Sequence, residues 1–154
     1  MEIPTLSEEE KWEMMREIFV LSKQADIGFI MQMGAEKMSE YAEMTSQQYA
    51  NMLQAQGKDN AIGFAMSEAI VRKNLMGSDV EVEGNPNEAT LNLKRDGSLM
   101  TAMNLIKKGL VPITKEDFQS GCIEGYFRPR AEKLGLKLDV EYTDDGYKIK
   151  INKK

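Results

Sequence analysis

The chain has 154 residues, one cysteine, no histidine and a net charge of −5. That length suits one domain with a single sizeable core. A lone cysteine excludes an intramolecular disulfide and a cysteine-rich zinc site, and the lack of histidine removes the commonest general base and metal ligand. The sequence has no apolar run of about 18 residues and no secretory start, so we expect a cytoplasmic protein without a membrane span or metal site.

The excess negative charge lies entirely in the first half of the chain. Residues 1–77 carry 7 basic and 12 acidic side chains, whereas residues 78–154 carry 13 of each. Because duplex nucleic acid requires a basic footprint, we expect no nucleic-acid partner. The only basic cluster lies at the end of the chain, and we interpret it as protection of a strand edge: Lys148, Lys150, Lys153 and Lys154.

Apolar residues at helical spacing predict helices from residue 7 to residue 77. Ser7 and Glu10 have the spacing of a capping box and start the first helix, which carries a stripe of Trp12, Met15, Ile18, Phe19 and Ser22. A second stripe, from Ile27 to Ala42, predicts a helix with Gly28 and Gly34 in its interior.

Two more helices are predicted before residue 77. Thr45-Ser46 is predicted to be the N-cap of a short helix that ends at Gly57. Asp59 is predicted to cap the next helix, which ends at Gly77. Their predicted inward positions are Tyr49, Met52, Leu53, Ile62, Ala65, Met66, Ala69 and Ile70.

From residue 78 the apolar period changes to two, which predicts strands. Residues 80–83 and 89–94 alternate around a turn at 84–87, and residues 136–142 and 147–151 alternate around Asp144-Asp145-Gly146. Between the hairpins, Ser98 is expected to cap a helix to about Lys108. Thr114 and Asp117 predict a capping box for another helix, which runs to about Phe127 and is interrupted at Pro129.

These elements predict one α+β domain over residues 1–154. A helical lead at 7–77 precedes a ββααββ unit at 78–152. Two hairpins around a helical pair favour a four-stranded antiparallel sheet with helices packed on one face.

Cys122 is the first candidate for a functional residue, because Phe118 and Tyr126 share its helical face at four-residue spacing. It is interpreted either as a small buried side chain or as a thiol lining a pocket. Gly121 and Gly125 flank it, which favours close approach of another backbone or a ligand. Glu124 between them is either solvated or a general acid or base.

Arg128 and Arg130 are the candidate residues for holding a ligand carboxylate, with solvated arginines at a helix end as the alternative. Arg95-Asp96-Gly97-Ser98 has the form of an anion-binding helix N-terminus. The 12 methionines crowd the helical half, which indicates a soft core or a flexible apolar pocket. Glu36, Glu40 and Glu43 share one helical face, interpreted as solvated.

Several segments of the second half carry a family resemblance: Val80-Glu81-Val82, Leu91-Asn92-Leu93, the helix bearing Cys122, Leu134-Gly135-Leu136 and the hairpin around Asp144-Asp145-Gly146. Residues 78–152 resemble the L-2-amino-thiazoline-4-carboxylic acid hydrolase family. They are similar in layout to 4-vinyl-reductase-type domains, which are related in fold to the TRAPP vesicle-tether subunits. Of three cysteines usual in the hydrolase-like family, this chain keeps the middle one. Arg95-Asp96-Gly97 and Tyr147 stand at the other two places.

The resemblance implies a domain that binds a small carboxylate or apolar ligand between helices and sheet, through Phe118, Tyr126, Arg128 and Arg130. One alternative is a hydrolase of a cyclic C–N or C–S bond that uses Cys122 or Glu124. The other is a non-catalytic module that forms a homodimer through its helical half. The resemblance identifies no cofactor.

Overall fold

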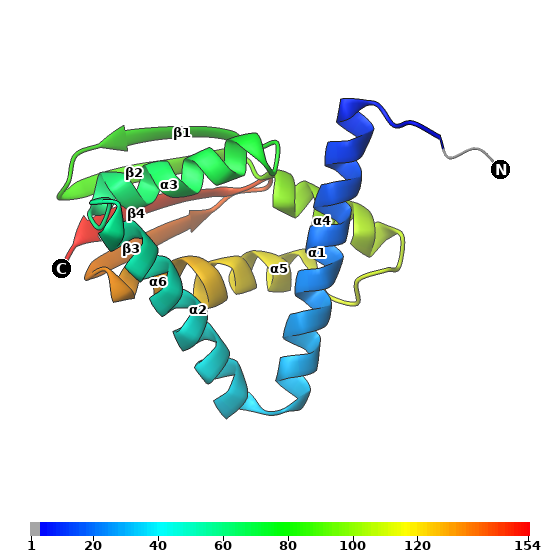
Figure 1. The fold of residues 1–154 in the computed structure, drawn as a ribbon, viewed down its shortest axis with the longest axis horizontal. Helices are drawn as coiled ribbons and strands as arrows, with labels where there is room; N and C mark the ends of the chain where they lie inside the picture. Colours follow the sequence, from blue (N-terminus) through cyan, green and yellow to red (C-terminus); the bar gives the residue numbers. More distant parts are fainter. Residues whose placement is uncertain (1–3) are drawn as a thin grey trace.

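The computed structural model describes residues 4–154. Its helical half consists of α1 (Glu8–Gln32), α2 (Ala35–Ala55) and α3 (Ala61–Asn74). The predicted capping box at the start of α1 is confirmed, because the Ser7 hydroxyl accepts from the Glu10 amide and the Glu10 carboxylate accepts from the Ser7 amide. In Figure 1, α1 and α2 diverge from their connecting turn as a V, and α1 is the arm farther from the sheet.

The helix boundaries predicted between residues 27 and 60 are wrong. Gly34 does not lie inside a helix: its φ of 103° belongs to the turn between α1 and α2. Thr45 and Ser46 lie in the middle of α2, where the Thr45 hydroxyl bonds back to the Tyr41 carbonyl instead of capping. Asn60, not Asp59, caps α3 by accepting a hydrogen bond from the Gly63 amide. Several neighbouring polar residues could each cap a helix, and the path of the backbone determines which of them does so.

The four strands are β1 (Asp79–Gly84), β2 (Glu88–Arg95), β3 (Leu136–Tyr142) and β4 (Tyr147–Lys153). They form one antiparallel sheet in the order β1-β2-β4-β3, so the predicted α+β fold is confirmed. The two hairpins join through β2 and β4, where Leu91 lies opposite Ile149.

Between the hairpins lie α4 (Gly97–Lys107), α5 (Lys115–Cys122), the π-helix η1 (Ile123–Phe127) and α6 (Arg128–Lys133). The predicted capping box of Thr114 and Asp117 is confirmed. Asp96 caps α4, so the prediction that Ser98 does so is wrong. Pro129 occupies the first turn of α6, where its missing N–H costs no hydrogen bond. It therefore continues the helical course that it was expected to interrupt.

The core lies on one face of the sheet. α3 covers β1 and β2, and α6 covers β3, as Figure 1 shows. Alternation along the strands sends Leu91, Leu93, Ile149 and Ile151 inward to full burial. Helices on one face of an antiparallel sheet leave the other face to water.

The outer face of the sheet carries alternating charge, and it corrects the interpretation of the C-terminal lysines. β4 is a central strand, so Lys148 and Lys150 do not protect an edge. Lys150 lies opposite Asp139, and Lys148 opposite Glu141, on β3. Opposite charges across neighbouring strands contribute modestly to sheet stability.

A second, smaller core joins α1 to the rest of the molecule. Val20 of α1 is buried against Leu99, Ala102 and Leu105 of α4, with Phe118 of α5 completing the cluster. Among residues 4–154, no helix combines the length and apolar composition that crossing a bilayer demands.

Candidate functional site

Cys122 lies where the two cores meet, because it packs against both hydrophobic clusters. It is the last residue of α5, and the π-helix η1 begins at the next position. A π-helix inserts one extra residue per turn and often occurs at functional sites. Here it rotates the helix between Cys122 and Tyr126, two residues that the sequence placed on one helical face.

A buried ion pair lies beside this junction. The Arg72 guanidinium on α3 is 3.2 Å from both carboxylate oxygens of Asp96, and the Asp96 side chain is fully buried. Arg72 also donates to the Ser98 hydroxyl at 2.9 Å, and its guanidinium lies over the Phe127 ring at 5.0 Å from the ring centroid. The arginine is therefore held by charge, a hydrogen bond and an aromatic face together.

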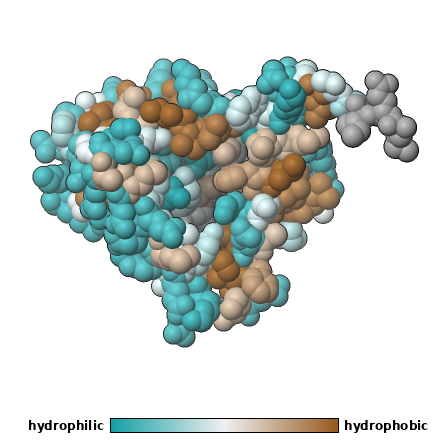
Figure 2. Space-filling view, viewed as in Figure 1, coloured by the Kyte–Doolittle hydropathy of each residue, from teal (hydrophilic) through white to brown (hydrophobic). Residues whose placement is uncertain are grey.

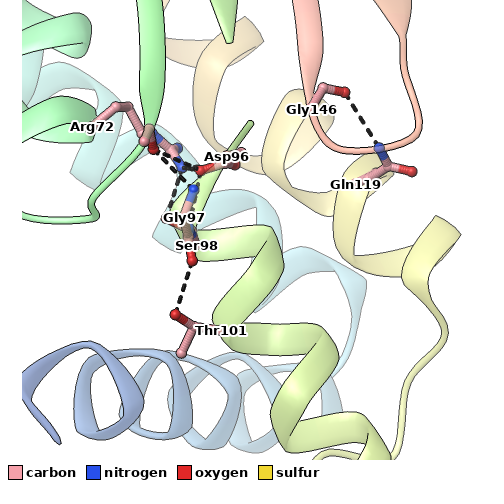
Figure 3. Close-up of polar contacts among 8 residues, drawn as sticks. Arg72, Asp96, Gly97, Ser98, Thr101, Gln119 and Gly146 are labelled. Carbon is pink, nitrogen blue, oxygen red and sulfur yellow. Dashed lines mark hydrogen bonds and ion pairs between the residues drawn. The ribbon is translucent and has the colours of Figure 1, made fainter. Parts of the chain in front are cut away.

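The start of α4 bonds to α3 through Arg72, to Ser78 before β1, and to the β3–β4 turn through the Asp145 carbonyl, and Figure 3 shows part of this network. The Asp96 carboxylate accepts from the Ser98 amide, and the Ser78 hydroxyl accepts from the Gly97 amide. From α5, the Gln119 side chain donates to the Gly146 carbonyl in the β3–β4 turn. The predicted anion site at residues 95–98 is thus occupied by the chain's own carboxylate, that of Asp96.

A second ion pair lies on the other side of Tyr126. Arg130 on α6 is 3.3 Å from the buried Glu68 carboxylate on α3. Its guanidinium lies 3.4 Å from the centroid of the Tyr126 ring and 4.2 Å from that of Tyr49. Tyr126 joins the two pairs, since Arg72 lies 5.4 Å from the same ring centroid. We call these residues the buried polar cluster: Tyr49, Glu68, Arg72, Asp96, Cys122, Tyr126, Arg130 and Tyr147.

Three buried atoms of the buried polar cluster have no hydrogen-bond partner among the described residues: the Tyr49 hydroxyl, one Glu68 carboxylate oxygen and the Tyr147 hydroxyl. Tyr49 lies near Glu68, which helps to raise the pKa of its hydroxyl. Tyr147 lies near Cys122, which has the same effect on the pKa of the Tyr147 hydroxyl. Buried polar atoms are usually satisfied by protein or by ordered water. Among the buried side-chain nitrogen and oxygen atoms of residues 4–154, these three have unused hydrogen-bonding capacity.

Burial keeps the thiol and the phenol groups of the cluster protonated at neutral pH. Burial raises the pKa of the Cys122 thiol to about 11, an effect that the nearby Arg72 guanidinium only partly offsets. Burial likewise raises the pKa of Tyr126 to about 12, and it raises those of Tyr49 and Tyr147 further. For Arg72, burial has the largest single effect and lowers the pKa, but the Asp96 carboxylate together with Tyr126, Cys122 and Glu68 outweighs it and raises the pKa. A thiol that stays protonated at neutral pH is not an activated nucleophile.

The structure separates the other predicted site residues. Phe118 is buried in the smaller core against α4. Glu124 is exposed and forms an ion pair with Arg128, whose guanidinium also donates to the Leu138 carbonyl. Arg128 and Arg130 therefore point to different partners and do not form one carboxylate clamp.

The flanking glycines, Gly121 and Gly125, are exposed and have open space where a side chain would extend. The expectation that another backbone of this chain approaches them closely is wrong. Closeness to a ligand stays a prediction.

Sequence reasoning missed Glu68, Arg72, Asp96 and Tyr147 as members of a cluster. A signal was present for two of them. Glu68 and Arg72 follow Phe64 at intervals of four, so these two charged residues lie on the same face of α3 as the buried Phe64. Charged residues at inward helical positions are rarely buried unless they are paired. The residues that pair with them come from α6 and from the end of β2, which the local sequence does not indicate.

Two surface depressions lie away from Cys122 and from the predicted ligand-binding residues, although Arg95 and Gly97 of the predicted anion site line the second. One, of about 490 Å³, lies on the outer sheet face between Glu83, Thr90 and Lys150. The other, of about 160 Å³, lies between α1 and the start of α4. Within residues 4–154 no group of three acidic or cysteine side chains has the arrangement of a metal site. Glu40 and Glu43 are exposed, and each pairs with a lysine.

A large apolar surface lies on α1 instead. Within Glu8–Gln32, Val20 is the only buried residue. We call six exposed apolar side chains the outer face of α1: Trp12, Met15, Ile18, Phe19, Phe29 and Met33, the last of which is the C-cap. In Figure 2, hydrophobic colour covers much of the α1 arm. The prediction that Met52, Met66 and Ile70 face inward is wrong, because all three are exposed. The predicted stripe from Trp12 to Phe19 is exposed as well.

We compared the chain with protein-family models, with curated proteins and with solved structures, and none of the three comparisons found a match.

Proposed function

We propose that this chain is a non-catalytic interaction module that self-associates through the outer face of α1. The observation that carries the proposal is the exposure of that face: Phe29 is 66% exposed and Met15 57%. Exposed groups of large apolar side chains on a protein surface often mark interfaces. The homodimer expected from the sequence is consistent with this proposal.

The composition of α1 favours a protein partner. Most helical stability in folded proteins comes from packing an apolar face, and within α1 only Val20 is buried, against α4. The aromatic side chains of α1, namely Trp12, Phe19 and Phe29, remain exposed. A partner that covers them would bury aromatic surface, the component that dominates interface energetics.

Sedimentation of the purified full chain tests the proposal. We expect the wild-type protein to form a dimer at micromolar concentration and Phe29→Glu to weaken dimerisation at least tenfold, which corresponds to roughly 1.4 kcal/mol. The physical reason is that the glutamate charge would have to be buried without a partner.

Leu110→Glu is the matched control, because Leu110 is 56% exposed but lies outside α1. It should leave the dimer unchanged. A wild-type protein that sediments as a monomer at several hundred micromolar, or equal weakening by both variants, would overturn the proposal.

Binding of a small ligand is the second candidate function, and the three unpartnered atoms of the buried polar cluster favour it. A small carboxylate or phenol could use the hydrogen-bonding capacity of Tyr49, Glu68 and Tyr147, provided that the core opens locally. This candidate keeps the chemistry implied by the family resemblance, but it moves the site from Arg128 to the two buried ion pairs.

Thermal-shift measurements with small carboxylates and phenols test the second candidate. A ligand that binds the native state must raise the melting temperature with its concentration. We expect Tyr147→Phe to reduce such a shift for a ligand bound beside Cys122, while Glu81→Gln on the outer sheet face leaves it intact. If no compound raises the melting temperature, the second candidate fails.

A further inference from the structure

The outer face of α1 follows the spacing of a coiled-coil seam. Residues 12, 15, 19, 22, 26, 29 and 33 are separated by three and four positions in alternation. This spacing keeps one stripe in line along a helix and is the pattern by which two helices interlock. The stripe is apolar at both ends and polar in the middle, where Ser22 and Asp26 are exposed.

Two copies of α1 could pair in parallel or antiparallel fashion, and the charges favour the antiparallel arrangement. Parallel pairing in register would set Asp26 against Asp26 of the other copy, inside the seam. It would also bring together the two acidic first turns, each with Glu8, Glu9 and Glu10. Antiparallel pairing separates both sets of like charges and aligns the helix dipoles favourably.

Two antiparallel registers keep the seam in contact, and they differ in how they match side chains. In the first, Trp12 faces Phe29 of the second copy, but Met15 then faces Asp26 and Phe19 faces Ser22. In the second, Phe19 faces Phe29, Met15 faces Met33 and Ser22 faces Asp26. The second register places aromatic with aromatic, methionine with methionine, and a hydroxyl donor with a carboxylate acceptor.

The positions beside the seam do not decide between the two registers. In the first register, Arg16 approaches Lys23 of the second copy. In the second register, Arg16 approaches Ile30 and Lys23 approaches Lys23 of the second copy. In both registers Lys23 lies 3.5 Å from Asp26 of its own helix, which balances its charge. The choice of register therefore rests on the side chains in the seam.

We propose that two copies of the chain pair antiparallel along α1, with Phe19 against Phe29 and with Ser22 against Asp26 as the polar layer that sets the register. This inference rests on the proposed function, because it specifies how the self-associating face is used. A single polar layer in an apolar seam fixes register at some cost in stability.

The available surface suits a small dimer interface. Aromatic side chains offer roughly 150–250 Å² each, so the exposed parts of Phe19 and Phe29 supply on the order of 200 Å² per copy. Trp12 lies outside the overlap of the two helices in this register, because α1 ends at Gln32. Met15, Ile18 and Met33 are each exposed by more than half. Together they bring the face toward the ~800 Å² per partner of a standard interface.

Cysteine cross-linking tests the arrangement in the full chain with Cys122→Ala, so that no other thiol is present. Phe19→Cys and Phe29→Cys variants are oxidised with oxidised glutathione, singly and mixed, at a concentration where sedimentation shows dimer. We expect the mixture to give covalent dimers and each single variant to stay largely unlinked. The Met15→Cys and Met33→Cys pair repeats the test if the phenylalanine variants dissociate.

Three outcomes would overturn the inference, and each is distinct. Efficient linking of Phe19→Cys to itself would show parallel pairing, and linking of Trp12→Cys to Phe29→Cys in place of the Phe19 pair would show the other register. A dimer by sedimentation with no cross-link at any of these positions would place the interface elsewhere. In contrast, a wild-type chain that never dimerises contradicts the proposed function itself.

Discussion

At the scale of single residues, the most consequential feature is the pairing of charges in the core. Arg72 and Asp96 are both almost fully buried, and each would be costly to bury alone. Asp96 also caps α4, so this one carboxylate orders a helix end and balances an arginine. The pair therefore couples α3 to the segment between β2 and α4.

Removal of one member of this pair should be strongly destabilising. We expect Arg72→Met to lower the free energy of unfolding by about 3–5 kcal/mol, because Asp96 would remain charged and unpaired in the core. The double variant with Asp96→Asn should recover part of the loss. Urea unfolding measures both, and Lys94→Met, which breaks the exposed pair with Glu81, should cost less than about 1 kcal/mol.

The raised pKa of Cys122 predicts a loss of stability in alkali. Its folded pKa of about 11 exceeds the ordinary value of 9.0, so above pH 9 the unfolded chain loses its proton first. The stabilisation is complete below pH 9 and is lost as pH rises from 9 to 11, by roughly 1–3 kcal/mol. Melting temperatures across this range, compared with those of Cys122→Ala, measure the effect; an identical pH profile for the variant would contradict the prediction.

At the scale of elements, close backbone contacts decide where glycine is required. Gly146 in the β3–β4 turn has the Leu93 carbonyl where a side chain would project, and the neighbouring Asp145 carbonyl accepts from the Asp96 amide at 2.7 Å. Gly121 on α5 faces open space. The hairpin turn thus serves as a docking point for the start of α4, whereas the glycine of α5 has no packing role within the chain.

Alanine at these two glycines should act in opposite directions. We expect Gly146→Ala to destabilise the protein by about 2 kcal/mol or more, because backbone must move away from the added carbon. Gly121→Ala should stabilise it by about 0.5–1 kcal/mol through helix propensity. Chemical denaturation of the two variants side by side checks the pair, and a destabilising Gly121→Ala would reveal a contact made at this position by a partner.

At the scale of the whole molecule, α1 is an arm attached to a compact core. The sheet and the helices α3, η1 and α6 share the larger hydrophobic cluster, whereas α1 contributes one buried side chain, Val20, to the smaller one. Stability is therefore uneven along the chain, and the region least supported by packing carries the most exposed apolar surface.

Amide hydrogen exchange should report this difference. In dilute protein, we expect the amides of α1 to exchange faster than those of the central strand β4, and to slow several-fold when the protein concentration is raised into the dimeric range. Exchange in β4 should not change with concentration. Protection of α1 equal to that of β4 at all concentrations would contradict this view of the arm.

Local patterns in the sequence determined much of this protein. Period-two alternation around Asp144-Asp145-Gly146 predicted the final hairpin, and hydroxyl–carboxylate spacing predicted the capping boxes at Ser7 and Thr114, because these signals depend on neighbours in the chain. The four-stranded antiparallel sheet with helices on one face also followed from the order of elements. In the predicted site, the packing of Cys122 against apolar neighbours was foreseen from its own helix.

Only the tertiary structure decided which face of each helix is buried and which charges meet. The stripe from Trp12 to Phe19 has the spacing of a core face, but the α1–α2 turn at Gly34 and the contact with α4 direct the opposite side inward. Likewise, Arg72 meets Asp96 across 24 residues, and Arg130 meets Glu68 across 62. The spacing of apolar residues shows that a helix has an apolar face, but it does not show which element packs against that face. Residues so far apart in the sequence are brought together only by the folded backbone.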